Sequence, residues 1–586
     1  MAFALVELKN RFLQTKTPVS IESFSSYDGL YSYDLSYGKQ ALLLISASTS
    51  ANIITYILNR QRLVTRDNIV IMFFLGEEKN YLNIQDQVLC NLTQSPSNPS
   101  GIPHYQTYLE NNCKFCRDGS YAVEVAGDVF LLENPKVNRI VFKITDPEKN
   151  LSNFVQQFMS KLKKDTVIKV NYKENSDSNQ KYDVYIDFVE ILNGLNTAGR
   201  YENFKKKLKD HINQYIPSNT RYLITLNDSA SKMLATYISD KIRDSYPENN
   251  KPIIITQDQI SSISNNDGAA VVVGSCISNG KNLLYISRAL RKFDELRIVY
   301  FMGISRMKDL ASLDFLMKNL KQGSYGSETN SFIEVDRIFC SNESKSTPWI
   351  KELDFLKLFL DFILDELPSN QLTINFIRDR KKMIEESAGD HKKGLSEKLF
   401  YPRMIDDKII ELEIRKNFAF FNFEKYDQDV TQSEVYFTIL NILETLRNSS
   451  KGDRYLRQTA FVRNLIDPEN FNRFNDGVIQ ASILRAAKTS ELAYSIDYQT
   501  SLDMLGTLET LIRYHSEEQG EALIEFIYAL ACEKMTLKQS HLTRVVELLY
   551  ENSNNEIIRS LGIYIERRIV KTNNFAKSAP QNSNNN

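Results

Sequence analysis

The 586-residue sequence lacks features that mark several whole classes of proteins. It has only six cysteines, too few for the disulfide framework of a secreted protein of this length. Its first residues lack the charged start, long apolar core and cleavage site of a secretory signal. The longest apolar runs, such as Ile69–Leu75 and Ala269–Val273, are far shorter than the ~18 residues that span a bilayer. These absences predict a cytoplasmic protein with no membrane partner.

Charge and missing motifs exclude further classes. Lys and Arg together number 72 and Asp and Glu 73, so net charge does not indicate a nucleic-acid partner. A local run, Lys205–Lys209, is interpreted as a solvated helix face, with a basic patch as the alternative. The sequence has no P-loop motif of the form GxxxxGKS or GxxxxGKT, and no HExxH, GxSxG or kinase signature. The histidines occur singly and are interpreted as surface residues: His104, His211, His391, His515 and His541.

The first domain, residues 1–150, contains a β-α-β pattern. Ala41–Ser46 and Ile69–Leu75 are short apolar runs, and Ile53–Arg62 between them has helical spacing. Because both runs are apolar throughout, they predict parallel strands that are covered on both faces. The intervening Ser46–Ser50 contains four hydroxyl side chains, which can cap the helix or bind an anion at its N-terminus.

The same domain contains a candidate zinc site. Cys113 and Cys116 form a CxxC, and Cys90 and His104 lie close enough in sequence to complete a set of four ligands. The spacing is irregular, so ordinary thiols or small buried side chains are the alternative. A thioredoxin-like redox role is less favoured, because the CxxC precedes a turn rather than opening a helix.

The second domain, residues 151–340, alternates strands with helices and predicts a parallel α/β sheet. The third, residues 341–572, repeats apolar residues at helical spacing and predicts an all-α domain of eight or more helices that could bind a protein partner. Residues 573–586 are polar and Asn-rich, which predicts a disordered tail. The strands and helices expected in the second domain are Tyr222–Leu226, Lys232–Arg243, Pro252–Thr256, Ala269–Val273, Lys281–Phe293 and Arg297–Met302.

One turn of the second domain is typical of a phosphate site. A buried strand ending at Val273 is followed by a polar turn and then by an amphipathic helix, so backbone N–H groups and a helix dipole meet there. Gly280 allows a positive φ and close approach of an anion. The alternative is a turn without a ligand, since small-residue turns occur in most doubly wound sheets. The turn consists of Ser278, Asn279, Gly280, Lys281 and Asn282.

These residues resemble the ribose-phosphate loop of the type I phosphoribosyltransferase family, and the resemblance covers about residues 201–307 alone. It implies that the turn binds the 5′-phosphate of a ribose phosphate or nucleotide. It also implies that an upstream loop contacts pyrophosphate. That loop consists of Asn227, Asp228, Ser229, Ala230 and Ser231.

The sequence departs from the family where two acidic residues hold the ribose hydroxyls, directly or through Mg²⁺. Gly274 and Ser275 stand at the matching positions, and neither can carry a charge. Binding of phosphoribosyl pyrophosphate with Mg²⁺ as a cofactor is therefore weakened, and stabilisation of the developing positive charge is lost. Asp228 is a carboxylate that could compensate.

Three hypotheses of function remain. The first is a sensor or effector that binds a ribose phosphate or nucleotide without turnover and signals through the helical domain. The second is an active phosphoribosyltransferase or another nucleotide-modifying enzyme, and the third is a structural scaffold. The missing acidic pair and the large helical domain favour the sensor. This plan loosely resembles effector proteins of bacterial antiviral defence or retron loci.

Overall fold

The structure is a computed structural model with two compact units. The first comprises Met1–Lys136 and Ala460–Val462, and the second comprises Val137–Thr459 and Arg463–Asn586. Each unit is described by itself. The structure describes residues 11 and 42–578, except for 61–63, 97, 104–123, 127–128, 132–135, 144, 148–149, 160–162, 164–165, 174–180, 248–249, 265–266, 324–325, 341–346, 388–393, 407, 417–419, 421–425, 450–453 and 460–461.

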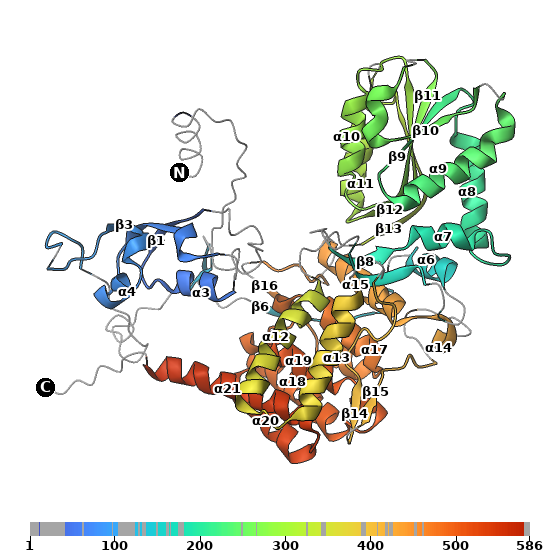
Figure 1. Ribbon diagram of the computed structural model, residues 1–586. Coiled ribbons are helices and arrows are strands. Elements are labelled where there is room, and N and C mark those ends of the chain that lie inside the picture. Colours follow the sequence, from blue (N-terminus) through green and yellow to red (C-terminus); the bar gives the residue numbers. More distant parts are fainter. Residues whose placement is uncertain are drawn as a thin grey trace, which may run out of the picture. The chain divides into compact units, whose positions relative to one another are not determined.

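The first unit contains the predicted β-α-β unit, and a third parallel strand extends its sheet (Figure 1). The buried side chains of its core come from α3, β2 and the segments beside them. The strands are less covered than the sequence predicts: no described residue of β1 is fully buried, and Phe73 on β2 is 42% exposed. The elements are β1 (Leu43–Ser48), α3 (Asn52–Arg60), β2 (Ile69–Phe74), α4 (Glu78–Leu82), β3 (Val88–Asn91), β4 (Glu124–Ala126) and β5 (Val129–Leu131).

A five-stranded, fully parallel sheet forms the α/β part of the second unit. Its strands lie in the order β10-β9-β11-β12-β13, so the first strand in sequence lies between the second and the third. This is one of the two common doubly wound orders, and the chain changes direction across the sheet between β9 and β11. The strands are β9 (Thr220–Thr225), β10 (Ile253–Thr256), β11 (Ala269–Ile277), β12 (Arg297–Met307) and β13 (Ser331–Phe339).

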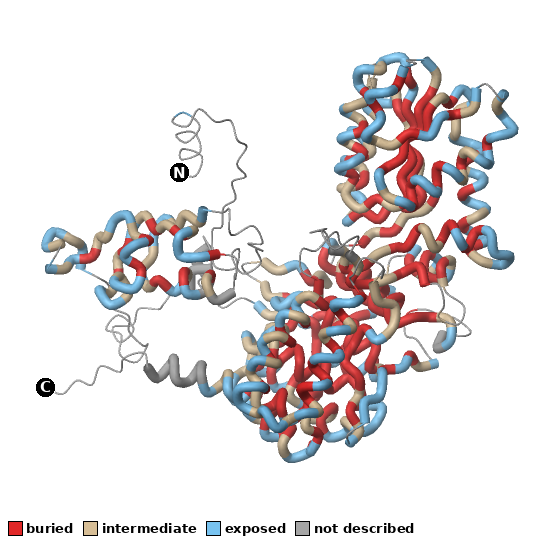
Figure 2. Tube along the Cα trace, in the orientation of Figure 1, coloured by how far each residue is buried: buried red, intermediate tan, exposed pale blue. Residues whose placement is uncertain are grey.

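Helices cover both faces of this sheet, as Figure 1 shows. On one face, Leu223 and Val271 pack with side chains of α8 (Glu202–Tyr215) and α9 (Ser229–Ile242). On the other face, α10 (Lys281–Leu290) and α11 (Leu310–Lys321) contribute six leucine and isoleucine side chains. The strands are therefore buried on both sides, which Figure 2 shows as a continuous buried layer. Their near-continuous apolar sequences follow from this burial.

The expected strand ends are wrong in two places. β11 continues to Ile277 and β12 continues to Met307, because the two strands keep pairing to the contact of Ile277 with Ser305. Gly274 and Ser275 consequently lie inside a strand, not in a turn. The phosphate-type turn is short and begins only at residue 278.

The rest of the second unit is mostly helical, but the expectation of an all-α region is wrong. β14 (Arg403–Ile405) and β15 (Lys408–Ile410) form an antiparallel hairpin, and β16 (Val462–Ile466) pairs with β6 (Lys136–Ile140). The strand signals are short and lie between long helices, so helical periodicity hides them. The helices are α12 (Pro348–Glu366), α13 (Gln371–Ser387), α14 (Tyr426–Asp429), α15 (Gln432–Asn448), α16 (Glu469–Arg473), α17 (Gly477–Ala486), α18 (Tyr498–Arg513), α19 (Leu523–Ala531), α20 (Gln539–Asn552) and α21 (Glu556–Ser578).

One core joins the helices to the second sheet. Val273 and Phe301 of the sheet belong to the same buried cluster as Trp349 and the central helix α15. The sheet and the helices therefore share one compact unit, and the division into domains at 151–340 and 341–572 stays a prediction. α6 (Leu151–Phe158), α7 (Phe188–Gly194) and the antiparallel pair β7 (Ile168–Lys173) and β8 (Lys181–Ile186) connect them.

The ends of the helical region bear on two further expectations. α21 continues to Ser578, so the expected disorder does not begin at 573. None of the helices in the described ranges combines the length and the apolar character that a membrane crossing requires.

Candidate functional site

The candidate site lies at the carboxyl edge of the second sheet, where β9 and β11 run side by side. Val273 on β11 is paired with Thr225, the last residue of β9. The loops after both strands therefore begin at the same edge, and each opens a helix. Ligands of doubly wound sheets bind at this edge, at the point where the strand order reverses. The structure thus brings together the two segments that the sequence singles out.

The loop after β11 opens α10 without a side-chain cap. Gly280 is the N-cap residue with φ of 67°, and as a glycine it has no side chain that could accept a hydrogen bond from the first turn. Within the turn, the Lys281 amide donates to Asn279 Oδ1 at 3.0 Å. Ser278 and Asn279 are half-buried, and Lys281 and Asn282 are exposed. The amino end of α10 thus presents backbone N–H groups and a positive dipole towards accessible space.

The glycine of this turn has a packing role that the sequence does not reveal. A Cβ atom at Gly280 would lie 2.4 Å from Leu316 Cδ2 on α11. The predicted positive φ is confirmed, but the missing side chain makes room for α11, so an anion is not needed to explain the glycine.

The loop after β9 opens α9 with a full side-chain cap. Asp228 Oδ1 accepts a hydrogen bond from the Ser231 amide at 2.7 Å, and Oδ2 accepts one from Ser231 Oγ at 2.6 Å. Asp228 therefore already supplies the negative charge that the amino end of α9 favours. Asn227 Nδ2 donates to Asp258 Oδ2 at 2.8 Å, while Ser229 is exposed and Ala230 packs in the core.

Ser275 links strand β11 to the loop after β9. Its hydroxyl donates to Asp228 Oδ1 at 3.0 Å, and its amide donates to Ser231 Oγ at 2.9 Å. Asp228 thus lies beside one of the two positions where the resemblance expects an acidic residue. This carboxylate comes from the loop after β9.

The other acidic position has no room for a carboxylate. A Cβ atom at Gly274 would lie 2.7 Å from Met302 Sδ and 3.2 Å from Leu226 Cδ1. A charge there would be buried against apolar groups without a partner. Mg²⁺ is usually held by one or two carboxylates together with waters and ligand phosphates. Asp228 Oδ1 already accepts hydrogen bonds from the Ser231 amide and the Ser275 hydroxyl, so this carboxylate is a weak partner for Mg²⁺.

Two hydroxyls at this edge were not predicted as site residues. Thr225 Oγ1 and Ser305 Oγ are fully buried, and neither has a hydrogen-bond partner among the described residues. Ser305 is paired with Ile277, so its side chain lies on the same face as α10, directly before the turn. Buried hydroxyls without partners are rare in folded proteins. A polar residue within an apolar strand was the only sequence signal for either one.

Residues of β8 and α7 pack against the carboxyl end of β12, beside the candidate site. Arg306 Nη1 donates to the Val184 carbonyl on β8, and a Cβ atom at Gly303 would lie 2.3 Å from Phe188 Cζ on α7. Burial raises the pKa of the Cys276 thiol to about 12, although Arg306 lowers it. Cys276 is therefore protonated at neutral pH and is no nucleophile.

The predicted zinc ligands fall mostly outside the described residues. His104, Cys113 and Cys116 lie in 104–123, which the structure does not describe. Cys90 is an exposed free thiol on β3. Among the described residues, no group of three or more potential ligands lies together, and the zinc site stays a prediction.

The hydroxyls of Ser46–Ser50 act as caps: Ser48 and Ser50 Oγ accept from the amides of Ala51 and Asn52 at 3.2 and 3.4 Å.

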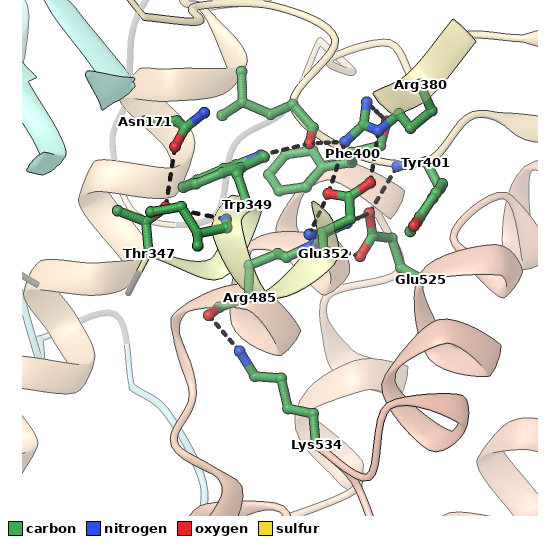
Figure 3. Close-up of polar contacts among 12 residues, drawn as sticks. Asn171, Thr347, Trp349, Glu352, Arg380, Phe400, Tyr401, Arg485, Glu525 and Lys534 are labelled. Atoms are coloured by element: carbon green, nitrogen blue, oxygen red, sulfur yellow. Dashed lines mark hydrogen bonds and ion pairs between the residues drawn. The ribbon is translucent and has the colours of Figure 1, made fainter. Parts of the chain in front are cut away.

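A second cluster of charges lies inside the helical region (Figure 3). Glu352 contacts Arg380 at 2.7 Å and Arg485 at 2.6 Å, and Arg485 contacts Glu525 at 2.8 Å. Burial raises the pKa of Glu352, but the two arginines outweigh it and hold the pKa below its usual value. Two acids balance two bases, and the Tyr401 amide also donates to Glu525 at 2.7 Å. This cluster joins helices and offers no spare group for chemistry.

Comparisons with known proteins give little further information. No model of a known protein family matches the chain, and no curated protein sequence matches it significantly. Among solved structures, UMP synthase of Leishmania donovani is similar with 12% identity and a TM-score of 0.22, over 59% of this chain and 61% of that one. The chain thus spans less than two thirds of that protein, and a TM-score this low carries no argument. The fold is argued from strand order and packing alone: a doubly wound parallel α/β sheet joined to a helical region.

Proposed function

We propose that the second sheet is a degenerate phosphoribosyltransferase-like domain that binds one phosphorylated ribose, as a ribose phosphate or a nucleotide, and senses it without turnover. The observation that carries the proposal is the uncapped amino end of α10, which opens at the point where the strand order reverses. Backbone N–H groups and a helix dipole at such a point favour a phosphate.

The residues at the two positions where the family has acidic side chains argue against transfer of the ribosyl group. The transferase reaction develops positive charge on the ribose, which needs fixed negative groups close by. Gly274 is packed against Met302, and Ser275 is neutral and bonded to Asp228. One hydrogen-bonded carboxylate is a weak replacement for two. The site is therefore suited to holding a ligand and poorly suited to reacting with it.

Binding of the ligand at the edge of the sheet would be signalled through the helical region. Asn441 Nδ2 on α15 donates to the Phe339 carbonyl at the end of β13, at 2.6 Å. Arg306 at the end of β12 contacts β8, which packs against the helical core. A ligand at the ends of β9 and β11 thus lies one strand away from the contact of β12 with β8 and two strands away from the contact of β13 with α15. A protein partner of these helices and a role in defence stay predictions.

The test uses a charge placed in the turn. Asn282 is exposed in the first turn of α10, so Asn282→Asp repels a phosphate without disturbing the core. Isothermal titration calorimetry with ribose 5-phosphate is expected to show saturable binding by the natural chain and none by Asn282→Asp. Asn282→Gln, which is neutral, is the matched control and should bind.

Two outcomes would favour the other hypotheses. Release of pyrophosphate from phosphoribosyl pyrophosphate in the presence of a nucleobase would establish an active transferase. Equal binding by Asn282→Asp and Asn282→Gln would show that the turn is not the phosphate site. Absence of binding by a folded natural chain, for ribose 5-phosphate and common nucleotides alike, would leave the structural scaffold.

A further inference from the structure

The outer surface of α10 and α11 exposes two aromatic rings. Both helices pack on the same face of the second sheet, with their leucine and isoleucine side chains turned towards it, as Figure 1 and the shared core show. Tyr285 on α10 and Phe315 on α11 lie on the opposite sides of these helices and are 59% and 67% exposed. Among the described residues of the second unit, Phe315 is the most exposed large apolar side chain. Neither ring therefore serves the core.

Basic side chains lie beside both rings. Arg288 follows Tyr285 by three residues on α10, and Lys318 follows Phe315 by three residues on α11, so each base shares one side of its helix with a ring. Lys292 lies in the turn directly after α10. All three bases are exposed. Charges and rings thus alternate over one continuous surface of two neighbouring helices.

The positive charge of this surface is not neutralised locally. Residues 281–292 contain four bases and no acidic residue, and the acid on α11, Asp314, is half-buried. Neither Arg288 nor Lys292 forms an ion pair with any residue in the part of the chain that the structure describes. The whole chain has a formal charge of −1, so its composition gives no sign of this patch. A local patch still attracts a polyanion when the net charge is close to zero.

The alternation of rings and bases suits one class of polyanion best. Unpaired bases of a single-stranded nucleic acid stack on exposed rings, while lysine and arginine contact the phosphates along the strand. A duplex offers the phosphates without free base faces. An acidic peptide would match the charge and leave both rings without a role. A membrane surface takes a helix with a continuous apolar face, whereas here charges separate the rings.

We propose that the outer surface of α10 and α11 binds single-stranded nucleic acid. Unpaired bases stack on Tyr285 and Phe315. The phosphates beside them contact Arg288, Lys292 and Lys318. The inference goes beyond the proposed function and does not depend on it, because none of these residues belongs to the two loops at the carboxyl edge.

Fluorescence anisotropy with the full chain and a labelled oligothymidylate of about 16 nucleotides tests the proposal. Tyr285→Ala and Phe315→Ala should each weaken binding about 5- to 100-fold, the effect of losing one stacked base. Arg288→Gln combined with Lys292→Gln should weaken binding as well. It should also reduce the slope of log affinity against log salt concentration by ~1.4, since each phosphate contact with a single strand contributes ~0.7.

The helix α8 supplies matched controls, because it packs on the opposite face of the sheet. Tyr215→Ala removes a ring that is 37% exposed. Lys206→Gln combined with Lys209→Gln removes two exposed charges. Both control proteins should bind the oligonucleotide as tightly as the natural chain does.

Four results would overturn the inference. The first is absence of binding by the folded natural chain, and the second is an equal loss of affinity in the control variants and in those of α10 and α11. The third is equal affinity for the oligonucleotide and for its duplex with the complementary strand. The fourth is tighter binding of a polyglutamate peptide or of phosphatidylserine vesicles, which would assign the surface to another class of partner.

Discussion

Gly280→Ala should destabilise the second unit for two separable reasons. The backbone at Gly280 has φ of 67°, which costs a residue with a side chain ~1–2 kcal/mol. The new methyl group would also lie 2.4 Å from Leu316 Cδ2, and overpacking of this kind costs ~1–3 kcal/mol. The expected loss in free energy of unfolding is therefore about 2–5 kcal/mol, measured by urea unfolding followed by circular dichroism.

Gly199→Ala separates the two terms. Gly199 has φ of 77°, but no atom lies within 4 Å of the position that its Cβ would take. This variant should lose only the backbone term, ~1–2 kcal/mol. Equal losses in both variants would refute the contact with Leu316 as the reason for glycine in the turn. Because the added methyl group faces α11, the folded fraction of Gly280→Ala should still bind ribose 5-phosphate.

Three further predictions concern the rest of the chain. Burial raises the pKa of the Glu434 carboxyl group to about 8. The protonated carboxyl group therefore contributes fully to the free energy of unfolding below the pKa of the unfolded chain, and this contribution is lost as pH rises through about 8. Glu434→Gln should remove this loss in unfolding curves measured from pH 5 to 9. Arg485→Met leaves Glu525 buried without its ion pair and should lower the free energy of unfolding by ~3–5 kcal/mol. Arg513→Met removes an exposed ion pair and should lower it by less than ~1 kcal/mol. Equal losses in the two variants would contradict the argument from burial. Metal analysis should find about one zinc per chain, and a stable metal-free protein would end that prediction.

The sequence predicted the parallel sheets because their strands carry a direct signal. Each interior strand is buried on both faces, so it consists of a short run of apolar residues between polar turns. The helices that follow have clear apolar stripes, such as that of α10. The two loops at the carboxyl edge could be found in the same way, because polar residues come directly after such runs.

Long-range pairing could not be predicted in the same way. The extension of β11 to Ile277 depends on β12, which pairs with it as far as Ser305. Nothing in the local sequence around Gly274 distinguishes a strand from a turn, since glycine and serine are common in turns. The short hairpin of β14 and β15 was missed because three-residue strands carry no periodicity.

The chemistry of the site was predicted only in part. The sequence places Asp228 and Ser275 in different segments, and only the packing of β9 against β11 brings their side chains to 3.0 Å. The contact of Gly280 with Leu316 depends on how α11 lies over α10. Residue types along the chain indicate which groups are available, whereas their partners follow from the tertiary structure.

The most direct test of the central claim is thermal unfolding of the full chain with ribose 5-phosphate, with and without Mg²⁺. A ligand at about 100 times its dissociation constant stabilises the unit that binds it by ~2.7 kcal/mol. We predict an upward shift of the unfolding temperature that is the same with and without Mg²⁺, because Gly274 and Ser275 supply no carboxylate at the two positions where the resemblance expects one. No shift with either ribose 5-phosphate or common nucleotides, in a chain that unfolds cooperatively, would contradict the account.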